Sequence, residues 1–304
     1  MPTSLTGRRI LITGATGQVA LPLTLALAAD NDVVALARFR DPVSRAQLER
    51  VGVSCVGVDL ADPDLREVPS AVDVVLHFAV VKSGRWDVDL RANAEATGLL
   101  MAHCKGAGAF LHCSSTGVYQ PAGHHQLIET DPLGDNHRAI MPTYSISKIA
   151  AEAVVRTECR QLELPTTIVR LNVPYGDNGG WPDWHLELIL ADAPVSVSHQ
   201  RPDLYNPIHE QDIIRMLPAL VDAAEVPATI VNLGGDEQVS LESWCEFLAE
   251  LVGRSVRFEP TEHTIASVTT DNAKRRSIAG ETLVDWRDGF ERMVRARHPD
   301  AIRS

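Results

Sequence analysis

Short apolar runs alternate with longer amphipathic stretches through the first half of the chain. The runs are rich in Val, Ile and Leu, and they occupy residues 9–13, 33–37, 53–58, 72–78, 109–113 and 166–171. The stretches at residues 18–29, 43–50, 87–105 and 143–162 have apolar residues at helical spacing. Strands that are apolar nearly throughout are buried on both faces, as in a parallel sheet covered by helices. The pattern therefore predicts an α/β fold with a doubly wound parallel sheet of Rossmann type.

A glycine-rich segment connects the first predicted strand to the first predicted helix. Gly14, Gly17 and Ala20 give the spacing G-x-x-G-x-x-A. Glycines permit a tight turn and let a pyrophosphate approach the N-terminus of the helix, where backbone N–H groups point at it. At the end of the first strand of a parallel sheet, this spacing predicts a bound dinucleotide cofactor.

The end of the second predicted strand bears on the identity of that cofactor. An acidic residue there would bind the 2′-hydroxyl of an unphosphorylated ribose, but the strand ends in Arg38. An arginine can hold a 2′-phosphate, so the sequence favours NADP over NAD. Asp41 is close enough along the chain to compete with this interpretation.

The pattern becomes irregular after about residue 172. Residues 175–182 are rich in Gly, Pro and Trp and indicate a loop. Helical spacing follows at residues 184–191 and 211–224, and residues 229–235 indicate one more strand. The predicted division is a dinucleotide-binding domain at residues 1–172, with residues 205–235 returning to it, and a smaller mixed C-terminal substrate lobe at residues 173–204 and 236–304.

Tyr144 and Lys148 lie one turn apart on one face of a predicted helix. A tyrosine with its ordinary pKa of roughly 10 is a poor base at neutral pH, but a neighbouring ammonium favours the phenolate. Ser115 follows the fifth predicted strand, where its hydroxyl could donate to a carbonyl oxygen near the tyrosine. The alternative for this Ser/Thr-rich segment is a loop that satisfies its own backbone.

Composition narrows the classes of partner. The 304 residues carry a formal net charge of -12, which disfavours nucleic acids and anionic membranes, so a small-molecule substrate is the expected partner. Residues 10–29 are uncharged, as in a signal peptide, but the glycine motif within them gives a better explanation. The five cysteines form no C-x-x-C pair and the eleven histidines form no metal-binding motif. We therefore predict no metal site and a cytoplasmic location.

With these motifs together, the sequence resembles the extended branch of the short-chain dehydrogenase/reductase superfamily, also called the NAD-dependent epimerase/dehydratase family. The matching positions are Gly14, Gly17, Ala20, residues 58–60 and 77–79, Asn93, Thr97, Leu100, residues 114–119, Tyr144, Lys148, Arg170, Tyr175, Gly176, Ile208, His209, Asp212 and residues 232–235. The resemblance implies an enzyme whose reaction begins with hydride transfer at a carbon that bears oxygen. It also implies a homodimer formed through the helices predicted at residues 87–105 and 143–162.

The resemblance assigns roles to individual residues. Tyr144 would be the general acid/base, Ser115 would orient the substrate, and Lys148 would hold the nicotinamide ribose and lower the pKa of the tyrosine. Asn93 would support the catalytic group from its helix. The cofactor would contact Gly14, Thr16, Gly17, Gln18, Val19, Arg38, Asp59, Leu60, Phe78, Ala79, Lys82, Tyr144 and Lys148.

Departures from the family pattern separate the possible reactions. A nucleotide-sugar dehydratase carries an Asp-Glu pair where this chain has Thr116 and Gly117, so elimination lacks its acid/base pair. The segment 77–82 is similar to that of UDP-galactose 4-epimerase. Against an epimerase, Asn172 stands one place early, and Tyr205 replaces the arginine expected to hold a diphosphate. A non-catalytic sensor would commonly lack the Tyr-Lys pair.

The first interpretation is therefore an NAD(P)-dependent oxidoreductase, with NADP favoured, that interconverts a secondary alcohol and a carbonyl. The alternatives are a UDP-sugar 4-epimerase with bound NAD and a non-catalytic NAD(P)-binding sensor. The residues expected to contact the substrate are Val81, Thr116, Tyr119, Asn172, Trp181, Trp184, Tyr205, Asn206 and His209. The two tryptophans beside a Gly-Gly turn would suit an apolar or cyclic substrate.

Overall fold

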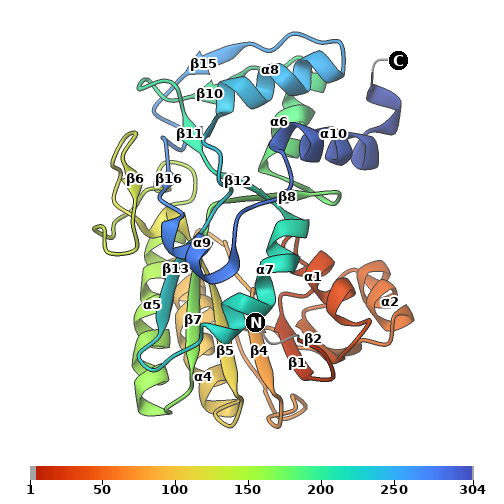
Figure 1. Cartoon of the computed structure of the whole chain (residues 1–304), viewed down its shortest axis with the longest axis vertical. Coiled ribbons are helices and arrows are strands. Elements are labelled where there is room, and N and C mark those ends of the chain that lie inside the picture. The colour runs from red at the N-terminus through yellow and green to blue at the C-terminus, as the bar shows by residue number, and fades with distance from the viewer. Residues whose placement is uncertain (1–4, 303–304) are drawn as a thin grey trace.

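A seven-stranded sheet forms the centre of the lower lobe in Figure 1, which shows a computed structural model that describes residues 5–302. The strand order is β13-β7-β5-β4-β1-β2-β3, and neighbouring strands are parallel throughout. The strands are β1 (Arg9–Thr13), β2 (Asp32–Ala37), β3 (Ser54–Gly57), β4 (Val74–His77), β5 (Ala109–Ser115), β7 (Thr166–Leu171) and β13 (Thr229–Leu233). The predicted doubly wound sheet is confirmed, with β1 and β4 at the point where the strand order reverses.

Helices cover both faces of this sheet because successive strand residues point to opposite sides. Ile10 and Ile12 pack with Leu23 of α1 (Ala20–Leu27) and Met216 of α7 (Glu210–Asp222). Leu11, between them, packs on the other face. The helices that meet that other face are α4 (Ala96–His103) and α5 (Tyr144–Gln161). α2 (Pro42–Arg50) contributes Leu48 to the first face.

Two predicted helices differ from the structure at positions near the site. The helix expected at residues 18–29 begins at Ala20, because residues 17–19 still belong to the glycine-rich turn. The single helix expected at residues 87–105 is divided into α3 (Trp86–Leu90), a π-helical turn η1 (Arg91–Glu95) and α4. Periodicity cannot reveal such a turn, since one extra residue changes the hydrogen bonding and hardly changes the apolar pattern.

The upper lobe is built from short strands and three helices among the described residues. Its helices are α6 (Trp181–Leu190), α8 (Leu241–Leu251) and α10 (Trp286–Arg297). The short strands and turns around them are η2 (Thr116–Val118), β6 (Gln126–Leu127), β8 (Val173–Gly176), β9 (Gly179–Gly180), β10 (Val195–Val197), β11 (Leu204–Tyr205), β12 (Pro207–His209), β14 (Val239–Ser240), β15 (Phe258–Pro260), β16 (Thr269–Thr270) and η3 (Pro299–Ala301). The short helix α9 (Ala273–Ala279) packs against α7 and β13 of the lower lobe. An aromatic cluster with Trp244 and Phe290 at its centre holds the helices together.

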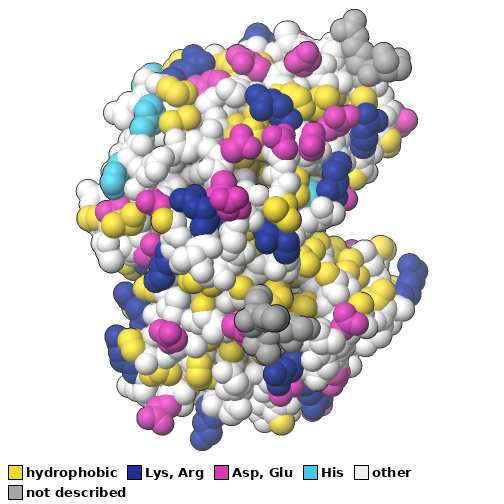
Figure 2. Space-filling view, in the orientation of Figure 1, with side chains coloured by type: hydrophobic (Ala, Val, Ile, Leu, Met, Phe, Trp, Pro, Cys, Tyr) yellow, Lys and Arg dark blue, Asp and Glu magenta, His cyan; other side chains and the backbone are white. Residues whose placement is uncertain are grey.

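The chain passes between the lobes several times. After the segment 173–209 it returns to the sheet through α7 and β13, and then crosses again to α8. The limits predicted for the two domains stay a prediction. A notch separates the lobes on the right of Figure 2, and hydrophobic side chains gather along its lower edge. No helix within residues 5–302 is long and apolar enough to cross a membrane.

Candidate active site

A cavity of about 540 Å³ lies at the carboxyl ends of the parallel strands, between the two lobes. We call it the main cavity. Its inner wall comes from the glycine-rich loop, the ends of β4 and β5, and the first turns of α5. Its outer wall comes from β8, α6 and the segment 265–268. Ligands bind at this edge in doubly wound folds because the chain segments diverge there.

A smaller cavity of about 190 Å³ continues from the main one beneath the glycine-rich loop. Gly14, Gly17 and Phe78 line both cavities. Gly14 has φ +69°, and a Cβ there would come within 2.8 Å of the Ala79 backbone. Only glycine therefore allows the loop to lie so close to the end of β4. Two connected cavities that share this loop fit an extended dinucleotide.

Every residue predicted to contact the cofactor lines one of these two cavities. Those on the smaller cavity are Gly14, Thr16, Gly17, Arg38, Asp59, Leu60, Phe78 and Ala79. Those on the main cavity are Gly14, Gly17, Gln18, Val19, Phe78, Lys82, Tyr144 and Lys148. The location is shown by the geometry, whereas the contacts themselves stay a prediction.

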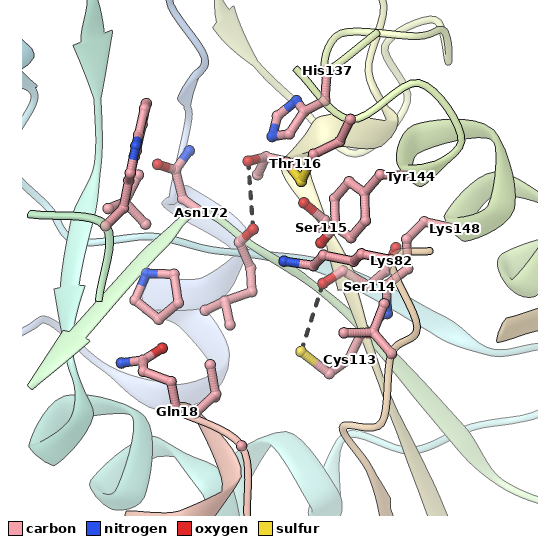
Figure 3. Close-up of a pocket in the computed structure, with 18 of the residues that line it drawn as sticks. Gln18, Lys82, Cys113, Ser114, Ser115, Thr116, His137, Tyr144, Lys148 and Asn172 are labelled. Atoms are coloured by element: carbon pink, nitrogen blue, oxygen red, sulfur yellow. Dashed lines mark hydrogen bonds between the residues drawn. The ribbon is translucent and has the colours of Figure 1, made fainter. Parts of the chain in front are cut away.

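Tyr144 and Ser115 meet on the wall of the main cavity (Figure 3). Tyr144 starts α5, and Ser115 ends β5, so the two elements bring the side chains together. Burial raises the pKa of Tyr144 to about 12, although a hydrogen bond with Ser115 acts in the opposite direction. The phenol is therefore protonated at neutral pH in the chain alone.

Lys148 lies one turn further along α5 and is buried. Its Nζ donates a hydrogen bond of 2.7 Å to the carbonyl oxygen of Cys113, and burial lowers its pKa. We expected this ammonium to lower the pKa of Tyr144. That expectation stays a prediction, since burial is the largest influence on this phenol and raises its pKa in the chain alone.

Asn93 occupies the π-helical turn and does not line either cavity. Its Oδ1 accepts a hydrogen bond of 2.8 Å from the backbone of Val81, and its Nδ2 donates one of 2.8 Å to the carbonyl of the same residue. Nδ2 also lies 3.1 Å from Oγ of Ser147 on α5. These contacts make Asn93 a positioning residue that holds the segment next to Lys82 against the catalytic helix.

Five of the residues predicted to contact the substrate line the main cavity: Thr116, Asn172, Trp181, Trp184 and Tyr205. Val81 lines the smaller cavity instead. Trp181, Trp184 and Tyr205 form part of the outer wall, and their rings belong to the aromatic cluster of the upper lobe.

Tyr119, Asn206 and His209 do not line either cavity, and these predictions need correction. The Tyr119 hydroxyl donates to Oδ1 of Asn232 at 2.6 Å. The Asn206 amide donates to the carbonyls of Gly235 and Glu237. His209 caps α7 by accepting from the backbone N–H of Gln211. These hydrogen bonds engage the Tyr119 hydroxyl, the Asn206 amide and Nδ1 of His209 with protein partners, which is the common use of buried polar groups.

Sequence reasoning missed the segment that precedes α5. His137, Ile140 and Met141 line the main cavity next to Tyr144. The His137 ring stacks on that of Tyr144 with a centroid separation of 5.6 Å. Ile265 and Val268, from the far end of the chain, complete the outer wall. No motif marks these positions, and only the position of His137 shortly before Tyr144 offered a signal.

The charges on the main cavity are few. Within residues 5–302, the cationic side chains on its wall are Lys82 and Lys148, and no arginine lines it. Arg201, which lies near the expected diphosphate position in sequence, forms an ion pair of 2.9 Å with Glu242. The Lys82 ammonium lies 4.9 Å from the centroid of the Tyr144 ring, and burial lowers its pKa.

Solved structures with the same fold include several enzymes that act on nucleotide sugars. A UDP-glucuronic acid 4-epimerase from Bacillus cereus, in complex with a fluorinated substrate analogue and NAD, superimposes with a TM-score of 0.80 at 21% identity, covering 94% of this chain and 97% of that one. A dTDP-glucose 4,6-dehydratase from Streptomyces venezuelae, with NAD bound, gives a TM-score of 0.82 at 21% identity, covering 96% and 97%. At this identity the likeness shows the fold.

Two sequence comparisons complete the assignment. A dTDP-4-dehydrorhamnose reductase from Burkholderia thailandensis is 33% identical over 165 residues, which is 53% of this chain and 50% of the relative, so the match spans about half the length of that protein. Residues 10–234 match the NAD dependent epimerase/dehydratase family. That match includes the glycine-rich loop and the Tyr144–Lys148 pair. The chain belongs to the NAD-dependent epimerase/dehydratase family.

Proposed function

We propose that the protein is an NAD(P)-dependent oxidoreductase that interconverts a carbonyl and a secondary alcohol on a substrate with an apolar body. The observation that carries this proposal is the combination of Tyr144, Ser115 and Lys148 with an outer wall that is aromatic and aliphatic. Trp184 on that wall and Ile140 in the segment before α5 line the main cavity and remain 51% and 47% exposed. These two side chains form an apolar surface between Tyr144 and the solvent, on which the apolar body of a substrate could lie.

The residues of the site divide the reaction between them. When bound, a nicotinamide dinucleotide supplies or takes up a hydride at the carbon that bears oxygen. In reduction, the Tyr144 hydroxyl would give its proton to the carbonyl oxygen. Because its pKa is raised to about 12, Tyr144 carries that proton at neutral pH. Ser115 would donate a hydrogen bond to the same oxygen and hold it next to Tyr144.

Arg38 supports NADP as the cofactor. It is exposed at the end of β2 and lines the smaller cavity, where a 2′-phosphate would lie. Asp41 does not compete for the ribose, because both of its carboxylate oxygens accept hydrogen bonds from the first turn of α2. The two fold neighbours described above contain NAD. The preference for NADP is therefore proposed for this chain from Arg38 and is not taken from those structures.

A nucleotide-sugar 4-epimerase with bound NAD is the second candidate. The fold neighbours include 4-epimerases, and Lys82 offers the main cavity an ammonium that has no carboxylate partner within residues 5–302. Against it, no arginine within residues 5–302 lines the main cavity to hold a diphosphate.

A direct experiment separates the two. Nucleotide released by denaturation is identified by chromatography, and the nucleotide-free protein is titrated with NADH and NADPH. NADPH oxidation with a cyclic or aliphatic ketone is the expected result. Tightly retained NAD, together with interconversion of UDP-glucose and UDP-galactose, would favour the epimerase.

We also propose that the protein forms a homodimer through α4 and α5. The two helices pack closely within the chain, since a Cβ on Gly98 would meet the Val154 side chain at 2.9 Å. Leu99 on the outer side of α4 is 54% exposed. Light scattering with Leu99→Glu tests this proposal, and an unchanged mass would contradict it. The cytoplasmic location stays a prediction.

A further inference from the structure

The His137 ring is fixed beside the proposed acid. It stacks on the Tyr144 ring at an interplanar angle of 30°. On its other side lies Gly117, where a Cβ would approach the imidazole within 2.8 Å. The backbone N–H of His137 donates to Oγ of Ser145 at 3.2 Å, and its carbonyl accepts from Met141 at 2.8 Å. The segment is therefore tied to the first turn of α5.

The polar atoms of this ring have no protein partner. Nδ1 is fully buried without a hydrogen bond, and no described residue between 5 and 302 bonds to Nε2. Figure 3 shows the His137 ring at the cavity above Thr116, and its Nδ1–Cε1–Nε2 edge lies close to Gly117. Burial, with Lys82 nearby, lowers the pKa of His137 to about 4. The imidazole is then neutral at pH 7 and offers one N–H donor and one acceptor.

Other polar side chains around His137 are already engaged. The Asn172 amide donates to the carbonyl of Val268 and accepts from the backbone of Asn206. The Ser114 hydroxyl donates to Glu152 at 2.6 Å, and Thr116 lies 3.4 Å from the carbonyl of Leu171. Besides Ser115 and Lys82, His137 is thus the polar group near Tyr144 on this wall that is left to meet a ligand.

Nδ1 is enclosed, so Nε2 is the ring nitrogen that a ligand can reach. A ligand that displaces water from Nε2 must supply a hydrogen-bond partner, or the nitrogen is left unpaired at a cost in free energy. The oxygens on two neighbouring carbon atoms are separated by about the length of a hydrogen bond, 2.7–3.2 Å. With their rings stacked, Tyr144 and His137 can each bind one of two such oxygens. We propose that His137 selects substrates that carry a second oxygen on the carbon next to the carbonyl, such as α-hydroxy ketones.

This inference rests on the proposed carbonyl reduction, and it adds a specificity-determining residue to it. Phenylalanine at this position retains the stacked ring but removes both nitrogens, whereas glutamine restores a hydrogen-bonding group. The two variants His137→Phe and His137→Gln therefore separate packing from hydrogen bonding.

The test compares 2-hydroxycyclohexanone with cyclohexanone at saturating NADPH. We expect the native protein to prefer the hydroxy ketone at least about tenfold in kcat/KM, as an unpaired buried polar group implies. In His137→Phe, the kcat/KM for the hydroxy ketone falls about tenfold more than that for cyclohexanone, and His137→Gln regains a preference of several-fold. An equal loss on both ketones, or an unchanged preference, would overturn the inference.

The rates of reduction and a calorimetric titration are needed together to distinguish the two proposals. The titration gives the Kd of each of the two ketones for the NADP-loaded protein. Reduction of both ketones without preference sinks the role of His137 and leaves the proposed function standing. If neither ketone is reduced, the proposed function fails, and a preference in Kd that His137→Phe abolishes would still support selection by His137. A native protein that neither reduces nor binds 2-hydroxycyclohexanone contradicts both.

Discussion

The ammonium of Lys148 donates to the carbonyl oxygen of Cys113 at 2.7 Å and thereby binds the catalytic helix to the end of β5. This hydrogen bond points the charge at the backbone of the strand that carries Ser115. The phenol of Tyr144 consequently lies in a buried place with Ser115 as its nearest hydroxyl. The geometry places Tyr144 beside Ser115 on the cavity wall and Lys148 against the backbone of β5.

Removal of the Tyr144 hydroxyl should stop turnover and spare cofactor binding. We expect Tyr144→Phe to lower kcat by about 10²–10⁴-fold, the usual contribution of a positioned acid. The dissociation constant for NADPH, measured by fluorescence, should change less than about twofold. Tyr119→Phe is the matched control, because its hydroxyl contacts Asn232 outside both cavities. A near-normal rate in Tyr144→Phe would show that another group transfers the proton.

The ionisation of Tyr144 can be followed in the cofactor-free protein. Burial raises the pKa of the phenol to about 12, so it stays protonated as pH rises through 10. The ultraviolet absorbance of phenolate, taken as native protein minus Tyr144→Phe, should therefore show no step below about pH 10. A step near neutral pH would mean that the Lys148 ammonium lowers this pKa after all.

Arg38→Ala should alter cofactor choice without altering the reaction. Loss of a charged hydrogen-bond donor to the 2′-phosphate should raise the Kd for NADPH about tenfold or more, and the Kd for NADH should hardly change. Arg66→Ala is the matched control, because Arg66 is exposed, pairs with Asp64 and lines neither cavity. Equal effects of Arg38→Ala on both cofactors would make Arg38 an ordinary surface charge.

The sequence predicted the inner half of the site better than the outer half. The sheet and the glycine-rich loop depend on residues that are close together in the sequence. Short segments are enough to recognise buried strands, a two-glycine turn and a Tyr-Lys pair one turn apart. The outer wall is brought together by long-range packing: Ile265 and Val268 lie about 120 residues from Tyr144. His209 was mistaken for a ligand contact because sequence cannot show that its ring caps α7.

A buried ion pair behind the site should be costly to break. Arg170 binds Glu152 through two hydrogen bonds of 3.0 and 2.8 Å, and Ser114 donates to the same carboxylate. Arg170→Met leaves that carboxylate buried without its partner, which should lower the free energy of unfolding by about 3–5 kcal/mol. Urea denaturation measures this loss.

An exposed pair of similar length provides the control for that experiment. Arg45 and Glu49 lie 2.7 Å apart on the surface of α2, with about half of each side chain exposed. Glu49→Gln should leave the urea midpoint nearly unchanged, because water screens exposed pairs. A small effect of Arg170→Met would show that Glu152 takes up a proton or finds another partner.

Replacement of His112 should raise the free energy of unfolding, whereas Arg170→Met should lower it. Both of its ring nitrogens are buried without a hydrogen bond, its ring stacks on that of His77 at 5.4 Å, and burial holds its pKa well below the ordinary 6.5. Below pH 6.5 the unfolded chain binds a proton that the folded chain does not, so the free energy of unfolding falls by about 1.4 kcal/mol per pH unit for this group.

The variant His112→Leu removes the imidazole that binds this proton in the unfolded chain. It also replaces a buried, unsatisfied polar side chain by an apolar one. We expect it to raise the free energy of unfolding at pH 7 by about 1 kcal/mol, because an apolar side chain suits the site better. Between about pH 6 and pH 4 the free energy of unfolding of this variant should fall less steeply than that of the native protein. The difference in slope should correspond to close to one bound proton. His263→Leu, at an exposed position, is the control for the slope. Destabilisation at pH 7 with an unchanged slope would mean that His112 holds a hydrogen-bonded water or ligand in its neutral form.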